Sequence, residues 1–95
     1  MAESVSITIQ IPRELRPLCD GSKSVALSAS SVRDSLEELE QQHPAIHRNI
    51  CDETGRLRRH INLFVNSSLM RERQGLDTVL ESGDVITILP AVSGG

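Results

Sequence analysis

The first strongly patterned segment of the chain alternates apolar and polar residues. From residue 5 to residue 11, valine or isoleucine occupies every second position, with serine, threonine and glutamine between them. A period of two is typical of a strand with one buried face. Pro12 ends the run, because proline has no N–H group to offer a strand ladder. A second alternating run at 24–29 follows a loop or wide turn at 13–23, so the two runs are predicted to pair as a hairpin.

The apolar spacing then changes from two residues to nearly four. Val32, Leu36 and Leu39 lie at i, i+4 and i+7, which predicts a helix over 32–42 with one apolar stripe against the sheet. The two serines before it are candidate N-caps. Its opposite face is acidic, as is usual for a solvent-exposed helix surface. Pro44 ends the helix, because proline restricts the residue before it.

The second half of the chain predicts shorter elements joined by turns. We expect, in order, a short helical piece in "AIHRNIC", a polar and basic loop at 52–60, a strand in "INLFVN", a short strand through Leu69 and Met70, a brief helical or 3₁₀ turn at 76–80, a Gly83-Asp84 turn and a last strand in "VITILP". No internal repeat interrupts this order.

This order predicts an α+β fold with a mixed sheet of four to five strands and one main helix packed across it. With the first strand beside the last in the middle of the sheet, the order is compatible with a β-grasp, although other two-layer α+β arrangements share it. At 95 residues, the chain has the length of a single domain.

Composition and charge narrow the classes of partner. Phe64 is the only aromatic residue, so no platform for stacking bases is present, and the formal net charge of −3 argues against nucleic acid. No apolar run has the length of a membrane span, and the first residues lack the pattern of a secretory leader. We therefore expect a cytoplasmic protein with neither nucleic acid nor a membrane as its partner.

The soft metal ligands do not form a convincing site. His43, His47 and Cys51 recur every four residues, but Pro44 interrupts the helix that would align them. We predict no metal, surface histidines and a half-buried Cys51 thiol. Cys19, in its loop, is expected to be a spectator thiol. No nucleophile–base spacing or phosphate-binding glycine loop is present, so no intrinsic catalytic residue is predicted.

The last six residues predict a functional tail. We expect a folded domain over 1–89 and a flexible tail over 90–95, which in extended form reaches about 20 Å. Glycine has no Cβ, so a Gly-Gly terminus can thread a channel too narrow for side chains and present its carboxylate as a substrate. The residues expected to enter partner sites are Pro90, Ala91, Val92, Ser93, Gly94 and Gly95. Ala91 and Val92 read equally well as the frayed end of the last strand.

The C-terminal segment carries a family resemblance. "SGDVITILPAVSGG", together with the opening "VSITIQIPRELRPLCDGSKSV", resembles the ubiquitin-like sulfur-carrier family that includes MoaD and ThiS. Gly83-Asp84, the aliphatic strand, Pro90 and Gly94-Gly95 stand where that family has its C-terminal motif. The stretches "FVN", "GLDT" and "ILPAV", with Arg71, are most similar to the CysO-type carriers of cysteine biosynthesis.

The resemblance implies one chemical cycle on Gly95. A ubiquitin-activating-type adenylating enzyme would use ATP on the Gly95 carboxylate, and a sulfur donor would then convert it to a thiocarboxylate. A client synthase, in the CysO branch a pyridoxal-phosphate cysteine synthase, would take the sulfur, and a zinc metallopeptidase would release cysteine. The chain would be a carrier rather than an enzyme, with no cofactor of its own.

Other clients and other roles remain open at this stage. The same tail chemistry serves molybdopterin, thiamine precursors and sulfur-containing secondary metabolites. A ubiquitin-like modifier of other proteins, or a noncovalent subunit that completes a partner's active site, would use the same tail. Phe64, Arg58, Arg59 and Arg71 are candidate docking residues for acidic partner enzymes. The basic run that holds two of them also reads as a solvated loop.

Overall fold

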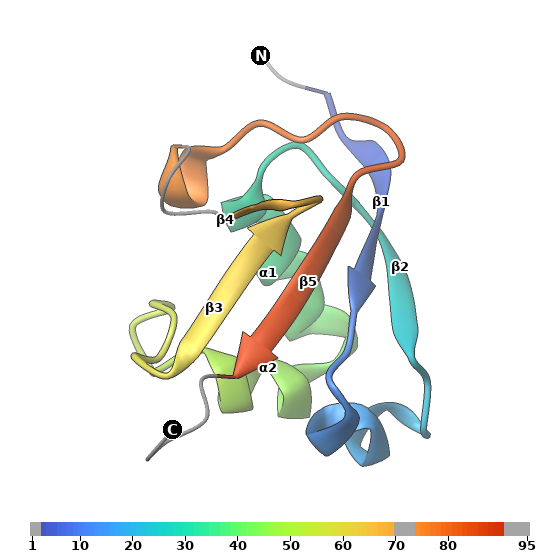
Figure 1. Cartoon of the computed structure of the whole chain (residues 1–95), viewed down its shortest axis with the longest axis vertical. Helices are drawn as coiled ribbons and strands as arrows, with labels where there is room; N and C mark the ends of the chain where they lie inside the picture. Colours follow the sequence, from blue (N-terminus) through green and yellow to red (C-terminus); the bar gives the residue numbers. More distant parts are fainter. Residues whose placement is uncertain (1–2, 70–73, 91–95) are drawn as a thin grey trace.

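The computed structural model of the chain describes residues 3–69 and 74–90, which form two layers (Figure 1). A mixed sheet in the order β2-β1-β5-β3-β4 makes one layer, and two helices cover one of its faces. The elements are β1 (Val5–Gln10), β2 (Ser24–Ala29), α1 (Val32–Gln42), α2 (Pro44–Ile50), β3 (Ile61–Val65), β4 (Ser68–Leu69) and β5 (Val85–Pro90), with 3₁₀ helices η1 (Arg13–Cys19) and η3 (Gly75–Asp77). The α+β prediction is confirmed.

The sheet is organised around two central strands that are far apart in the sequence. β1 pairs parallel with β5, from Thr8 opposite Val85 to Gln10 opposite Thr87. β2 lies antiparallel on the other edge of β1, and β3 lies antiparallel on the other edge of β5. The predicted hairpin of the first two strands and the predicted adjacency of the first and last strands are therefore both confirmed.

The core lies between the sheet and the helices, where the predicted alternation places it. Ile7 and Ile9 of β1 face the helices together with Ile86 and Ile88 of β5, and all four are buried. The predicted stripe of α1 is buried as well, as expected for a helix that packs on a sheet.

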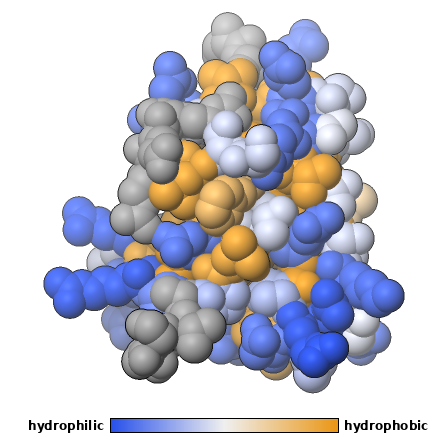
Figure 2. Space-filling model, viewed as in Figure 1, coloured by the Kyte–Doolittle hydropathy of each residue, from blue (hydrophilic) through white to orange (hydrophobic). Residues whose placement is uncertain are grey.

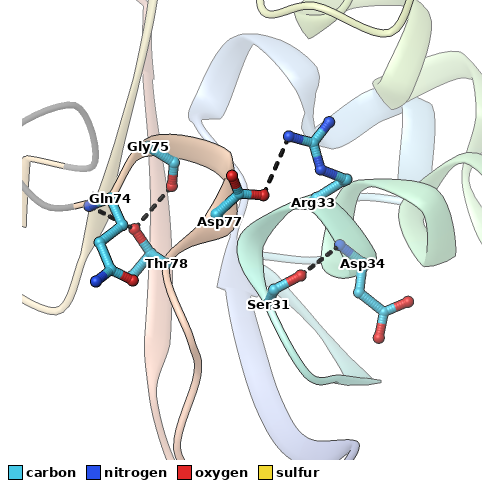
Figure 3. A network of polar contacts seen from close by, with 7 residues as sticks. All are labelled: Ser31, Arg33, Asp34, Gln74, Gly75, Asp77 and Thr78. Carbon is cyan, nitrogen blue, oxygen red and sulfur yellow. Dashed lines mark hydrogen bonds and ion pairs between the residues drawn. The ribbon is translucent and has the colours of Figure 1, made fainter. Parts of the chain in front are cut away.

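The start of α1 is capped as the serine pair predicts. The Asp34 N–H donates to Ser31 Oγ at 3.1 Å, and Asp34 Oδ2 accepts from the Ser30 N–H at 2.8 Å. The two residues thus satisfy N–H groups that a helix start otherwise leaves unpaired. Figure 3 shows that this cap faces the 74–78 turn, where Arg33 forms an ion pair with Asp77 at 3.2 Å.

The 74–78 turn is held by its own polar contacts and by the backbone. Thr78 Oγ1 donates to the Gly75 carbonyl at 2.7 Å and accepts from the Gln74 N–H at 3.2 Å (Figure 3). The Val32 N–H donates to the Thr78 carbonyl at 3.1 Å. These bonds join the turn that leads into β5 to the start of α1.

One predicted loop is a 3₁₀ helix in the structure, and one predicted short strand is described only in part. The stretch expected to be a loop contains η1, which packs Leu15 and Cys19 against the core and ends at Asp20 in a left-handed conformation. Pro17 and the Asp20-Gly21 pair suggested a turn, but a 3₁₀ helix tolerates both where they stand. Of the predicted short strand, β4 contains Leu69, and Met70 lies outside the described residues.

Within residues 3–69 and 74–90, neither α-helix has the length and apolar character needed to cross a membrane.

Replacing Ile86 by alanine tests the central strand. Ile86 is 0% exposed, so we expect Ile86→Ala to lower the free energy of unfolding by about 2–5 kcal/mol, the usual cost of such a cavity. Leu89→Ala on the same strand is the matched control, because Leu89 is 46% exposed and should change stability by no more than about 0.5 kcal/mol. Urea unfolding of both variants measures the difference, and equal losses would contradict this placement of β5.

Candidate functional site

The candidate site lies at the end of β5, where the chain leaves the sheet. Pro90 is the last residue of this strand and pairs with Ile61 of β3, so it belongs to the sheet and not to the predicted tail. Proline is tolerated there because the strand ends with it. The other predicted tail residues, Ala91, Val92, Ser93, Gly94 and Gly95, lie outside the described residues, and their role stays a prediction.

The start of β5 is fixed by the Gly83-Asp84 turn. Gly83 adopts φ +90°, a region that favours glycine, and its N–H donates to the Ser6 carbonyl at 2.9 Å. Asp84 accepts from the Glu81 N–H at 2.8 Å and from Asn66 Nδ2 at 3.0 Å. This part of the family-like motif therefore has a structural role, which is to set where β5 begins.

The sheet face opposite the helices presents an apolar strip beside β5. Phe64 is half-buried on this face of β3, opposite Thr87 of β5 and Leu69 of β4. Leu89 projects from the same face next to the strand end and is 46% exposed. Figure 2 shows this face, with hydrophobic residues across its middle and hydrophilic ones toward its lower end. An exposed apolar strip of this kind suits contact with another protein.

Two of the predicted docking arginines lie in the loop that leads into β3. Arg58 is exposed, but its Nε donates to the Arg48 carbonyl at 3.1 Å and its backbone N–H donates to the Ile50 carbonyl at 2.9 Å. Arg59 is exposed beside it. Both line a hollow of about 400 Å³ along β3, which also contains Leu69 but not Phe64. The structure therefore places these arginines beside β3 and Leu69, while Arg71 lies outside the described residues.

The loop that carries Arg58 is closed by Asp52. One carboxylate oxygen, Asp52 Oδ1, accepts from the Thr54 hydroxyl at 2.6 Å, from the Thr54 N–H at 2.8 Å and from the Arg56 N–H at 3.1 Å. These hydrogen bonds favour the charged form and hold the pKa of the Asp52 carboxyl below its usual value. A short, internally bonded loop of this kind gives its arginines a defined position.

The histidine and cysteine predictions need correction. His47 is buried, at 8% exposure, and its Nδ1 lies 3.9 Å from Glu40 Oε2, so it is not a surface histidine. The orientation of α2 against α1 decides this burial, and the sequence spacing carries no signal of it. Cys51 is fully rather than half buried, at 1% exposure. His43 serves as the junction between α1 and α2.

Neither thiol has the environment of a reactive cysteine. Burial, with the carboxylates of Asp52 and Glu40 nearby, raises the pKa of the Cys51 thiol to about 11. Cys19 is buried as well, and its Sγ–H contacts the carbonyl oxygens of Arg16 at 3.5 Å and Ser22 at 3.4 Å.

A separate groove of about 550 Å³ lies between α1, α2 and the 52–58 loop, lined by side chains of both charges. Among the residues that the structure describes, no three His, Cys, Asp or Glu side chains are grouped to hold a metal.

Comparison with known proteins decides the family. A model described as the ThiS family matches residues 9–95. The chain belongs to the ThiS family. It is 38% identical over 93 residues to "Sulfur carrier protein CysO" of Mycobacterium tuberculosis, an alignment that covers 96% of this chain and 100% of that protein. The chain is thus a ubiquitin-like sulfur carrier of the ThiS/MoaD family, and the resemblance seen in its sequence is confirmed.

Solved structures agree with the family and with the β-grasp fold. The crystal structure of the Amycolatopsis orientalis BexX/CysO complex contains a chain 37% identical to this carrier, with a TM-score of 0.84, over 94% of this chain and 99% of that one. The solution structure of small archaeal modifier protein 1 from Methanosarcina acetivorans matches at 31% identity and a TM-score of 0.85, over 97% and 98% of the two chains. The predicted β-grasp is therefore confirmed.

The sequence reading missed three residues of the carrier around the end of β5. Leu89 could have been found, because it continues the outward-facing positions of the last alternating strand. Arg16 and Lys23 line a further hollow of about 400 Å³ against residues 87–89 of β5. They come from a distant part of the sequence, and only the parallel pairing of β1 with β5 brings them to this place.

The Cys51 environment predicts slow thiol chemistry. With a pKa of about 11, about one Cys51 thiol in a thousand is ionised at pH 8. In a Cys19→Ala background, we expect the iodoacetamide reaction of the folded carrier to be slow at pH 8 and to keep accelerating up to pH 11. Urea-unfolded carrier is the control and should react with an ordinary thiol profile. A native rate that levels off below pH 9 would show that the thiol is more reactive than its surroundings indicate.

Proposed function

We propose that this carrier bears sulfur as a thiocarboxylate on Gly95. Its carboxylate is adenylated by a ubiquitin-activating-type enzyme that uses ATP, and a sulfur donor then converts the product to the thiocarboxylate. The observation that carries this proposal is the 38% identity to a sulfur carrier protein over nearly the whole chain. The Gly94-Gly95 pair falls within the residues that the family model matches.

The chemistry explains why a partner enzyme is needed. A carboxylate is a poor electrophile, so one of its oxygens first attacks the α-phosphorus of ATP and pyrophosphate leaves. Hydrosulfide supplied by the donor, which is already at the oxidation level of sulfide, then attacks the acyl carbon of Gly95. AMP leaves with the electron pair of the C–O bond, and the sulfur loses its proton to give the thiocarboxylate. The carrier supplies the reacting group, while ATP and catalytic side chains belong to the partner.

The fold supports a carrier role because the strand that leads to the C-terminal residues is held in the sheet up to Pro90. β5 is paired with β1 from Val85 to Thr87 and with β3 from Ile86 to Pro90, so the β3 pairing holds its last residue in the sheet. Five residues follow Pro90, and five extended residues span about 17 Å, one residue less than the sequence alone suggested. Leu89 and Phe64 provide an apolar contact beside the point of departure.

Cysteine biosynthesis is the client pathway that we propose first. In it, a synthase that uses pyridoxal phosphate accepts sulfur from the thiocarboxylate, and a zinc metallopeptidase releases cysteine from the carrier. The name of the mycobacterial relative supports this choice. Molybdopterin, thiamine or a sulfur-containing secondary metabolite would use the same tail with a different synthase. Identifying the synthase that binds the carrier separates these clients.

A covalent modifier is the second candidate. Two related proteins carry the name small archaeal modifier protein 1, one of them 32% identical over 78 residues. The same activated Gly95 would then be transferred to lysines of other proteins. Isopeptide remnants of the Gly94-Gly95 terminus on cellular proteins would favour this role, and their absence beside abundant thiocarboxylate would exclude it.

Intact-mass measurement tests the proposed carrier state. We expect carrier isolated from its own host, or incubated with the adenylating enzyme, ATP and a sulfur donor, to gain the mass difference between sulfur and oxygen. Alkylation of that product should be located at Gly95 by fragmentation. A variant that lacks Gly95 should lose the alkylated product completely, because the reacting carboxylate is then misplaced. Unmodified carboxylate in the complete reaction would contradict the proposal.

The apolar strip predicts a separate effect on partner binding. We expect Leu89→Ala to raise the KM of the adenylating enzyme for the carrier by about five- to thirty-fold, because a buried leucine contact contributes about 1–2 kcal/mol at an interface. Its kcat should not change. Val79→Ala is the matched control, since Val79 is 54% exposed and projects from the loop before β5 rather than from its end. Equal KM values for the two variants would remove Leu89 from the interface.

A further inference from the structure

Four cationic side chains surround the end of β5 from two sides. Arg16 and Lys23, from η1 and the turn before β2, line the hollow against residues 87–89 of β5. Arg58 and Arg59 line the hollow along residues 61–63 of β3, the strand whose Ile61 pairs with Pro90. We call these four residues the basic collar. They come from segments that are more than thirty residues apart, so the collar is a product of the fold.

Within the part of the chain that the structure describes, no residue of the basic collar forms an ion pair, although Arg58 lies near enough to the Asp52 carboxylate to interact with its charge. Among residues 3–69 and 74–90, Arg33 forms an ion pair with Asp77 and His47 Nδ1 lies 3.9 Å from Glu40 Oε2, and neither contact includes a collar residue. Each of the two hollows brings two cations to one place with no carboxylate in its lining, so an anionic partner would be attracted to either side of the strand end. Unpaired cations of this kind are therefore available to a partner.

Two of the collar side chains are also held in position. Arg16 Nε donates to the Ile11 carbonyl at 3.1 Å, and Arg58 Nε donates to the Arg48 carbonyl at 3.1 Å. In each case the bond uses the inner nitrogen and directs the outer two nitrogens of the guanidinium elsewhere. A guanidinium fixed in this way is prepared for a carboxylate, which it can bind through two parallel hydrogen bonds.

The positive charges of the basic collar lie at one end of the sheet. The chain carries a formal net charge of −3, yet its collar cations gather where β5 ends. The segments that carry the collar also hold carboxylates, Glu14 and Asp20 in and after η1 and Asp52 and Glu53 in the loop before β3, but none of these lines either hollow. Two basic hollows on either side of one strand end orient a molecule in the field of a negatively charged partner before contact is made.

We propose that the basic collar docks this carrier onto a ring of carboxylates around the channel through which its adenylating partner admits the C-terminal residues. The proposal rests on the proposed function, which supplies that partner. Because the collar flanks β5 on both sides, attraction to an acidic rim points the strand end at the channel. The apolar strip then makes the short-range contact. An acidic rim also disfavours anionic proteins that lack such a collar.

Removing single collar charges tests this inference in the complete reaction. Lys23→Gln is the first variant, since Lys23 is exposed and its substitution should leave the fold intact. We expect it to raise the KM of the adenylating enzyme for the carrier by about two- to five-fold at low salt, as for one partly screened charge pair. The double variant Lys23→Gln/Arg59→Gln should raise it by about ten-fold, mostly through slower association. At high salt the differences from the unchanged carrier should shrink, and kcat should stay constant throughout.

Three matched variants make the test specific. Lys23→Arg keeps the charge and should retain the original KM. Arg33→Gln removes the same charge at the opposite end of the sheet and should also leave KM unchanged, because its exposed ion pair with Asp77 contributes little. Arg16→Gln should behave like Lys23→Gln, and thermal unfolding separates its effect on docking from the loss of its bond to Ile11.

The outcomes separate this inference from the proposed function. If the unchanged carrier acquires the thiocarboxylate and Lys23→Gln and the double variant match it at every salt concentration, the collar proposal is overturned while the carrier function stands. A KM increase as large for Arg33→Gln as for Lys23→Gln overturns it as well, because net charge alone would then explain the effect. If the unchanged carrier never acquires a thiocarboxylate, the proposed function fails, and the collar proposal fails with it.

Discussion

The parallel pairing of β1 with β5 is the constraint on which the rest of this structure depends. It joins residues 8–10 to residues 85–87, so every other described element lies in the connection between two neighbouring strands. A connection between adjacent parallel strands has to cross one face of the sheet, and here α1 and α2 make that crossing and cover the core. Burial of Ile9 and Ile86, which lie opposite each other in this pair, stabilises the arrangement at its centre.

The same pairing decides what surrounds the candidate site. Because β1 and β5 run in the same direction, the segment that follows β1 and the end of β5 meet at one edge of the molecule. β3 is antiparallel to β5, so the loop that precedes β3 arrives at this edge too. Arg16 and Arg58 therefore flank one strand end, although no local sequence feature links them. The basic collar therefore depends on the directions of β1, β3 and β5. No single sequence motif contains all of its charged residues.

The sequence predicts the parts of this fold that depend on local periodicity. The alternation from Val5 onward, the stripe of α1 and the cap at Ser31 all reflect contacts within a few residues, and each is found in the structure. The 3₁₀ helix Arg13–Cys19 was missed because packing of its apolar side chains on the core outweighs the turn-forming residues within it. His47 was misplaced for a similar reason, since its burial depends on how α2 lies against Glu40. The grouping of arginine and lysine side chains around the end of β5 depends on the pairing of β1 with β5. Local sequence patterns do not show this pairing.

The buried thiols bear on where this molecule can hold sulfur. A persulfide carrier needs an accessible, readily ionised cysteine, whereas Cys51 is enclosed by the core with its pKa raised to about 11. Cys19 is enclosed as well, against the carbonyls of Arg16 and Ser22. Opening either site would disrupt packing that the small core depends on, because a domain of this size has little stability to lose. A carrier built this way needs a sulfur-bearing group other than these buried thiols, and the proposed thiocarboxylate on Gly95 is such a group.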